Sequence, residues 1–344
     1  AKLAKKIECG AQFIIPQVGY DMRKMDEILQ WLNYKNLKVP VLANIYILPY
    51  SVSKFMNANN VPGCVVTDKM VADLAAEAAA PDKGKAARLL RAAKHYAIAK
   101  GMGCAGAHLA GHNISYQMVE YIIDKGEELS KGWKGLVEEF DYPQKEGFYF
   151  FEKNAATGLN SDTLSVRPSR RRIPLIYRIS RLAHSIMFNE KSLFFRMFQP
   201  TAARIDSKPR AKRNFGWLEH QAKTAMFGCM NCGDCGLFDV AYICPMSQCP
   251  KQQRNGPCGG SYEGWCEVYP GERECIWVQA YNRLKRFGEE GKIEQNIVPP
   301  CNWALTETSS WLNFYLGRDH TAKKLGIAPP KKRGKKAEVP AGQA

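Results

Sequence analysis

Residues 229–275 read CMNCGDCGLFDVAYICPMSQCPKQQRNGPCGGSYEGWCEVYPGEREC and hold eight of the twelve cysteines of this 344-residue chain. Cys229, Cys232 and Cys235 are each separated by two residues, and Cys244 follows in a Cys-Pro step. Two-residue spacers let neighbouring thiolates reach one centre from a tightly turning backbone, and nearby glycines permit such turns. The spacing therefore predicts a small metal-binding domain.

All eight cysteines of the stretch are candidate ligands of this metal. They are Cys229, Cys232, Cys235, Cys244, Cys249, Cys258, Cys266 and Cys275. They could serve two four-thiolate sites, or one site with the other thiols structural. The close spacing is typical of ferredoxin runs and favours a 4Fe–4S cluster, although four thiolates also bind Zn²⁺. Disulfides or scattered core cysteines are less favoured, because the rest of the chain has the character of a cytosolic enzyme.

The charge of the chain is strongly positive, with a formal net charge of +16. Five of those charges lie in the KKRGKK run of residues 331–336, and with the nearby prolines this run predicts a disordered basic tail over 321–344. The remaining surplus suits an anionic substrate or cofactor as well as RNA. No apolar run reaches transmembrane length, so we expect a soluble, cytoplasmic protein without a membrane partner. Because Ala1 stands inside a charged helical pattern, we interpret the chain as a fragment.

Residues 1–140 alternate between apolar runs and amphipathic helical patterns. The apolar runs predict buried strands over 11–20, 39–48 and 103–111, with a short extended piece at 63–66. Helical spacing of apolar residues predicts helices over 21–36, 51–60, 67–79, 84–100 and 114–126. This alternation predicts an α/β fold built on a parallel sheet, either open or closed.

In such a fold, functional side chains lie at the carboxyl ends of the strands. The polar residues at those positions are Gln17, Tyr20, Tyr46, Tyr50, His108 and His112. Each of them alone is as well explained by packing or by hydrogen bonding to loop backbone. Their common placement at one rim makes that rim a candidate binding site.

The composition changes over residues 141–220, which contain two basic runs at 167–172 and 208–213. Arginine-rich runs among aromatic residues could form a nucleic-acid surface, but no recognition module surrounds them. We therefore interpret this range as a basic linker with one amphipathic helix over 174–188. The predicted organisation is a first domain over 1–140, a linker over 141–220, a cysteine-rich domain over 221–320 and a tail over 321–344.

Several of these stretches resemble methylenetetrahydrofolate reductases. GAQFIIPQVGYD (10–21), with Lys6 upstream, resembles the region of their sixth strand, VPVLANIYILP (39–49) their seventh strand and GCAGAHLAG (103–111) their eighth. The NGPCGGS, CEVYP and CIW pieces resemble the cysteine-rich C-terminal domain, or small partner subunit, that accompanies such reductases in acetogens.

The resemblance implies the C-terminal part of a flavin-binding (β/α)₈ TIM-type barrel, followed by a small cysteine-rich metal-binding domain. It implies flavin-mediated reduction of 5,10-methylenetetrahydrofolate to 5-methyltetrahydrofolate in one-carbon metabolism. The implied cofactors are FAD or FMN together with a 4Fe–4S cluster or Zn²⁺. The implied partners are methylenetetrahydrofolate and either NAD(P)H or an electron-donor protein, within an oligomer or complex.

The resemblance also implies roles for individual residues. Gln17 matches a glutamine that binds the pterin, Phe55 an aromatic that stacks on the folate, and His112 lies at the same substrate rim. Lys6 matches a lysine near the flavin phosphates, and His108 a histidine close to the flavin ring. The acidic residue that serves proton transfer in the family lies upstream of the matching region, so the catalytic residue is unknown. Pro16 replaces the family's usual threonine, and Val18-Gly19 replaces a bulkier pair.

Two other classes of function remain open from the residues alone. One is a non-catalytic metal-binding adaptor subunit of a reductase complex. The other is a zinc protein that binds nucleic acid, which the arginine runs and CxxC spacing prompt but which leaves the α/β half unexplained.

Overall fold

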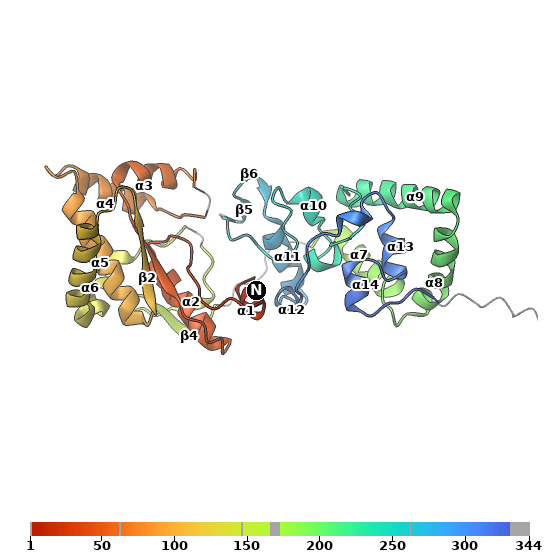
Figure 1. Cartoon of the computed structure of the whole chain (residues 1–344), viewed down its shortest axis with the longest axis horizontal. Coiled ribbons are helices and arrows are strands. Elements are labelled where there is room, and N and C mark those ends of the chain that lie inside the picture. Colours follow the sequence, from red (N-terminus) through yellow and green to blue (C-terminus); the bar gives the residue numbers. More distant parts are fainter. Residues whose placement is uncertain (1, 62, 146, 166–172, 262, 331–344) are drawn as a thin grey trace, which may run out of the picture. The chain divides into compact units, whose positions relative to one another are not determined.

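The computed structural model describes residues 2–61, 63–145, 147–165, 173–261 and 263–330, which form helices and small two-stranded sheets (Figure 1). The chain divides into two compact units. Unit 1 is Ala1–Ser169 together with Pro257–Cys275, and unit 2 is Arg170–Gly256 together with Ile276–Ala344. Among the described residues, no helix combines the length and the apolar character that crossing a bilayer demands.

Unit 1 contains the predicted alternation of helices and strands. Its elements are α1 (Lys2–Glu8), α2 (Met22–Tyr34), β1 (Leu42–Ile47), α3 (Tyr50–Asn57), α4 (Asp68–Ala78), α5 (Lys85–Met102), β2 (Gly106–Gly111), α6 (Tyr116–Leu129), the 3-10 segment η1 (Ser130–Phe140), β3 (Phe151–Lys153), β4 (Asn160–Leu164), β5 (Trp265–Cys266) and β6 (Tyr269–Glu274). The five helices predicted between residues 21 and 126, and the strands predicted over 39–48 and 103–111, are confirmed.

The sheet of β1 and β2 is parallel, with Leu42 opposite Gly106 and Ile47 opposite Gly111. One face of β1 is buried, because Ala43, Ile45 and Ile47 pack into a core with side chains of α2, α5 and α6. Figure 1 shows α5 and α6 on one side of this sheet. The mixed α/β class predicted from the alternation is therefore confirmed, and the other face of the sheet is only partly buried.

Residues 11–20 do not form the regular strand that was predicted. The segment lies beside β1 but pairs only through isolated parallel bridges, from Ile14 to Val41 and from Gly19 to Val65. Proline has no amide hydrogen, so Pro16 cannot donate to a continuous ladder. The prediction that Phe13 to Ile15 are buried is also wrong, since Phe13 is 57% exposed and Ile15 is 43% exposed.

Unit 2 consists of short and long helices around the cysteine loop. Its elements are α7 (Leu175–Met187), α8 (Leu193–Asp206), α9 (Pro209–Phe227), η2 (Phe238–Val240), α10 (Pro245–Gln248), α11 (Ile276–Lys285), α12 (Lys292–Gln295), η3 (Trp303–Leu305), α13 (Ser310–Tyr315) and α14 (His320–Lys324). Phe195 of α8 and Tyr315 of α13 stack at 4.9 Å between ring centroids, inside a core that also contains Ala322 of α14.

Two parts of unit 2 differ from the sequence-based expectation. The amphipathic helix predicted over 174–188 is α7. The supposed linker over 141–220 also contains β3 and β4 of unit 1, and its later residues form α8 and the first part of α9. Aromatic residues on α8 supply the apolar face that packs into the core. The supposed tail begins with the ordered helix α14, and Gln199 donates to the carbonyl of Ala328 at 2.9 Å. The basic runs at 167–172 and 331–336 lie outside the described residues.

Candidate functional site

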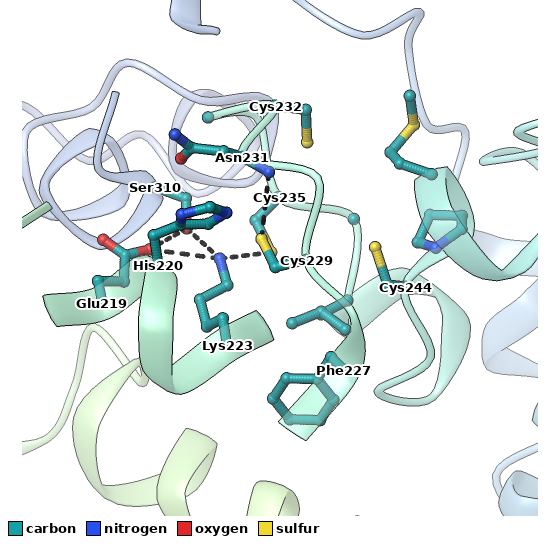
Figure 2. Close-up of a pocket in the computed structure, with 15 residues that line it drawn as sticks. Glu219, His220, Lys223, Phe227, Cys229, Asn231, Cys232, Cys235, Cys244 and Ser310 are labelled. Carbon is teal, nitrogen blue, oxygen red and sulfur yellow. Dashed lines mark hydrogen bonds and ion pairs between the residues drawn. The ribbon is translucent and has the colours of Figure 1, made fainter. Parts of the chain in front are cut away.

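Four of the predicted metal ligands line a single pocket in unit 2. Cys229, Cys232, Cys235 and Cys244 surround it together with side chains from the end of α9 and the start of α13 (Figure 2). Helix α9 ends at Phe227 and is capped by Gly228, whose φ of 62° turns the chain directly into the cysteine loop. The short spacers then return three thiols to the same cavity.

The loop conformation depends on Gly233, which stands between the second and third cysteines. Its φ is +71°, and a Cβ at this position would lie 1.8 Å from the carbonyl oxygen of Leu305. Only glycine fits such a close approach with a positive φ. The backbone amide of Asn231 donates to Sγ of Cys229 at 3.4 Å, which places a hydrogen-bond donor on one of the four thiols.

A buried lysine borders the same pocket. Lys223 of α9 is 5% exposed, and its Nζ lies 3.5 Å from Sγ of Cys235, 2.6 Å from Oγ of Ser310 and 3.3 Å from Oε1 of Glu219 (Figure 2). Glu219 is itself buried and accepts hydrogen bonds from Ser309, Ser310 and the amide of Trp311 at the start of α13. Burial alone would lower the pKa of Lys223, but the charges of Cys235 and Glu219 outweigh it and raise that pKa.

Burial and crowding affect the thiols themselves. Burial, followed by the nearby Cys235, Cys301 and Cys244, raises the pKa of Cys232 to about 12. The pKa of Cys235 is also raised, again mainly by burial. Buried thiols that oppose one another's ionisation become thiolates readily when a metal cation supplies the compensating charge. The chemistry of the donor set therefore fits a thiolate-bound metal.

A second buried cation and a fifth cysteine lie on the Cys232 side. Arg254 is 6% exposed and forms an ion pair with Asp234 at 3.2 Å, and its charge acts on both Cys232 and Cys301. The Nε and Nη1 atoms of Arg254 are buried without a hydrogen-bond partner among the described residues. Two orphaned donors of this kind fit an anionic group next to them.

Asp234 connects this region to α14. It accepts from the amide and from Nδ1 of His320, while Nε2 of the same ring lies 2.8 Å from Asp239. Burial lowers the pKa of His320, but the hydrogen bonds to the two carboxylates raise it to about 9. Asp234, Arg254 and His320 thus form a charged cluster that includes a residue of the cysteine loop itself.

The four thiols share this pocket without converging on a common point. Within the described residues, no group of three or more Cys, His, Asp or Glu side chains is arranged closely enough to hold a metal ion. All twelve cysteines lie within the described residues and none forms a disulfide.

The other four predicted ligands lie elsewhere along the chain. Cys249 follows α10 in unit 2. Three of them, Cys258, Cys266 and Cys275, belong to the segment Pro257–Cys275. This segment is part of unit 1 and contains the β5–β6 hairpin. Sγ of Cys258 is 3.5 Å from Oε1 of Glu267 in this hairpin.

In unit 1, one predicted rim residue, His108, takes part in hydrogen bonds on the partly buried face of the sheet. His108 of β2 is exposed, and its Nδ1 lies 3.1 Å from Oδ1 of Asn44, its partner in the β1–β2 register. Asn44 in turn donates to the carbonyl of Pro16 at 3.0 Å, next to Gln17. The Asn44 amide thus links three parallel segments.

The remaining predicted site residues differ in exposure: Tyr20 is buried, Tyr46 and Tyr50 are half-buried, and the others are exposed. Gln17 is exposed, with its Oε1 accepting from the amide of Val18 at 3.1 Å, and a Cβ on Gly63 would lie 3.3 Å from its Nε2. Phe55 is 55% exposed on α3, and His112 is exposed directly after β2. Lys6 is exposed on α1. Tyr20 is buried, and its hydroxyl donates to the carbonyl of Tyr46.

Four participants were missed by reasoning from the sequence. Lys223 and Arg254 have no spacing that sets them apart from other basic residues, and Cys301 stands alone, 26 residues after Cys275. Asn44 could have been found from the alternation of β1, because it is the one amide on the polar face of an otherwise apolar strand.

Comparison with family models gives one match to this region, the family described as "Methylene-tetrahydrofolate reductase C terminal", over residues 209–304. The matched range runs from α9 to η3 and includes the eight predicted cysteine ligands as well as Lys223 and Cys301. The predicted relationship to methylenetetrahydrofolate reductases is therefore confirmed. Neither the curated proteins nor the solved structures gave a match.

Proposed function

We propose that the chain is part of a methylenetetrahydrofolate reductase-like oxidoreductase, whose unit 2 carries a metal centre. The family match over residues 209–304 supports the reductase theme, and the single pocket shared by four cysteines is the observation that carries the metal centre. In this proposal unit 1 is the C-terminal part of a flavin barrel, with β1 and β2 as two of its parallel strands. An electron-donor protein or NAD(P)H supplies the reducing equivalents.

The ligands of the proposed centre are Cys229, Cys232, Cys235 and Cys244. Their sulfurs line one cavity, and burial raises the pKa of two of the thiols, Cys232 and Cys235. Buried cations lie on both sides, with Lys223 next to Cys235 and Arg254 next to Cys232. A 4Fe–4S cluster is the preferred occupant, with four-thiolate Zn²⁺ as the alternative. Bound there, a cluster would supply one-electron transfer, whereas zinc would stabilise the fold or a docking surface.

The folate side of the proposal rests on the rim of unit 1. Gln17 offers an amide donor and acceptor, which suits the paired edge of a pterin ring. Phe55 and His112 stand exposed and available for contact with substrate. Asn44 holds His108 in orientation through a hydrogen bond between paired strands, so this imidazole has a fixed place on the sheet.

The residues proposed for the flavin fit one rim of a cofactor site and not an enclosed pocket. Lys6 and His108 are both exposed, as is Gln17, so the described residues do not surround a flavin ring by themselves. When bound, the flavin would supply the hydride for reduction of the folate. The contribution of this chain's own residues is orientation of the pterin through Gln17 and a polar edge through His108.

The metal half of the proposal is tested on protein purified without oxygen. We expect a brown protein with iron and sulfide in cluster stoichiometry, and loss of that colour in Cys232→Ser. Cys9→Ser is the matched control, because Cys9 is exposed near α1 in unit 1 and its loss should leave the metal content unchanged. Colourless protein with stoichiometric zinc would show that the centre binds zinc and not an iron–sulfur cluster. Protein that contains no metal would contradict the proposed metal centre.

The folate half is tested by Gln17→Ala in the active reductase. Loss of the amide leaves the pterin edge unpaired, so methylenetetrahydrofolate turnover at low substrate should fall about tenfold to a hundredfold. Electron transfer from an artificial donor to the flavin should stay near normal, because it does not use the pterin contact. Wild-type turnover in this variant, with the metal present, would show that either the folate assignment of Gln17 or the alignment of unit 1 with the barrel is wrong.

A further inference from the structure

We propose that Lys223 is a positioning residue of the metal centre, whose buried ammonium group donates a hydrogen bond to Sγ of Cys235. The inference rests on the proposed function, in which Cys235 is a ligand, and it adds a residue that lies outside the cysteine pattern. The inference concerns how the protein positions the thiolate of Cys235, and it does not change which thiolates bind the metal.

The geometry of Lys223 leaves one hydrogen for the sulfur. An ammonium group has three hydrogens, and Nζ has three neighbours with acceptor atoms: Oε1 of Glu219, Oγ of Ser310 and Sγ of Cys235. Figure 2 shows these three contacts converging on Lys223 at the edge of the pocket. Because the group is 5% exposed, water does not compete for these hydrogen bonds.

The position of the ammonium group is set by Glu219, one turn earlier on α9. The carboxylate of Glu219 accepts from both Ser309 and Ser310 and from the amide of Trp311, so the start of α13 fixes it on one side. Lys223 is held on the other side at the i,i+4 spacing. This arrangement restrains Nζ next to Cys235 whether or not a metal is bound.

A hydrogen bond to a metal-bound thiolate has two consequences. It stabilises the thiolate form, which favours retention of the metal, and it lowers the energy of the sulfur lone pairs. Partners that hydrogen-bond metal ligands typically change metal affinity by about tenfold to a hundredfold when they are removed. Glu219 compensates the charge of Lys223 in the metal-free protein, so the ammonium group can remain buried without the metal.

The test uses the full chain, stripped of metal and titrated with Co²⁺ as a spectroscopic probe of thiolate ligation. In Lys223→Met we expect Co²⁺ affinity to fall about tenfold to a hundredfold. We also expect the sulfur-to-cobalt charge-transfer band to move to longer wavelength, since a sulfur without its hydrogen bond gives up electron density more easily. Lys223→Arg keeps a charged donor and should retain the wild-type band. Arg213→Met, an exposed cation removed from the same helix, should match wild type in both measurements.

The band position separates a direct hydrogen bond from a general loss of stability, because a purely structural role changes affinity without moving the band. Wild-type affinity and band in Lys223→Met, with Co²⁺ bound in the wild-type protein, would overturn the role of Lys223 and leave the metal centre intact. Absence of Co²⁺ binding by wild type would instead overturn the proposed centre itself. If Lys223→Met does not fold, Glu219→Gln decides, since a displaced ammonium group should shift the same band and an unchanged band rejects the inference.

Discussion

At the scale of the residue, the two units each contain a histidine that packs among aromatic rings. His95 of α5 is 1% exposed and lies between Tyr20 and Phe140, at centroid distances of 6.5 Å and 5.6 Å. His184 of α7 stacks on Phe238 at 4.2 Å. Burial lowers the pKa of each imidazole to about 4. Both residues are therefore neutral in the folded protein near neutral pH, and neither belongs to a candidate site.

His95 makes the stability of unit 1 depend on pH in a defined direction. The unfolded imidazole gains a proton near pH 6.5, whereas the buried one gains it only near pH 4. The contribution of neutral His95 is thus complete above pH 6.5 and is lost as the pH falls toward 4. Between pH 6.5 and pH 4, the free energy of unfolding should therefore fall by about 3 kcal/mol less in His95→Gln than in the wild-type protein. Urea unfolding of both proteins at pH 7 and pH 4.5 measures this difference. An equal loss of unfolding free energy in the two proteins would contradict the prediction.

At the scale of the element, one amide joins α2 to the β3–β4 hairpin. Nδ2 of Asn160 donates to the carbonyl of Arg23 at 2.9 Å and to Oδ2 of Asp26 at 2.8 Å, and its Oδ1 accepts from Nε of Arg23 at 2.9 Å. Arg23 also donates to the carbonyl of Phe151 at 2.7 Å. The hairpin is therefore bound to the helix through hydrogen bonds between segments that are far apart in the sequence.

Loss of this amide should detach the hairpin. We expect Asn160→Ala to lower the free energy of unfolding by about 2 kcal/mol, because Asp26 and Arg23 each lose a partner in a partly buried place. Asn154→Ala is the control, since the Asn154 side chain bonds amides of its own turn at Ala156 and Thr157. Hydrogen exchange should become faster at Phe151 and Leu164 in Asn160→Ala alone. Equal exchange in both variants would mean that the hairpin does not depend on Asn160.

At the scale of the whole molecule, the division into two compact units implies that each unit has its own free energy of unfolding. If the metal centre lies in unit 2, metal binding contributes to the folding of that unit, on the order of 10 kcal/mol in small thiolate sites. This is comparable to the entire stability of a domain. Unit 1 has its own cores, built around β1 and around α4 and η1, and these do not include the four pocket cysteines.

Chelation should therefore act on one unit. We expect a calorimetric scan of the metal-loaded protein to show two transitions, of which a strong chelator lowers or abolishes one and leaves the other within a few degrees. Proteolysis of the chelated protein should cleave first within 209–256. A single transition that moves as a whole would show that the units unfold together and that the metal stabilises both.

Sequence patterns determined the features that depend on short spacing. Alternating apolar residues were sufficient for β1, β2 and the helices between them, because burial of one face repeats every two or every 3.6 residues. The C-x-x-C-x-x-C spacing likewise placed Cys229, Cys232 and Cys235 around one cavity, since so short a loop leaves them no room to separate. The aromatic content of 193–206 was also visible, but its partners in α13 lie far along the chain.

Only the tertiary structure decided which distant side chains complete these local patterns. Ser310 contacts Lys223 although the two residues are 87 positions apart in the sequence. Arg254 and Cys301 likewise come close to Cys232 from separate parts of the chain. Phe13 and Ile15 look like core residues in sequence, yet their exposure depends on which segments pack beside them. Spacing rules describe neighbours along one helix, strand or turn. Long-range contacts arise from how those elements pack, and no periodicity in the sequence records that packing.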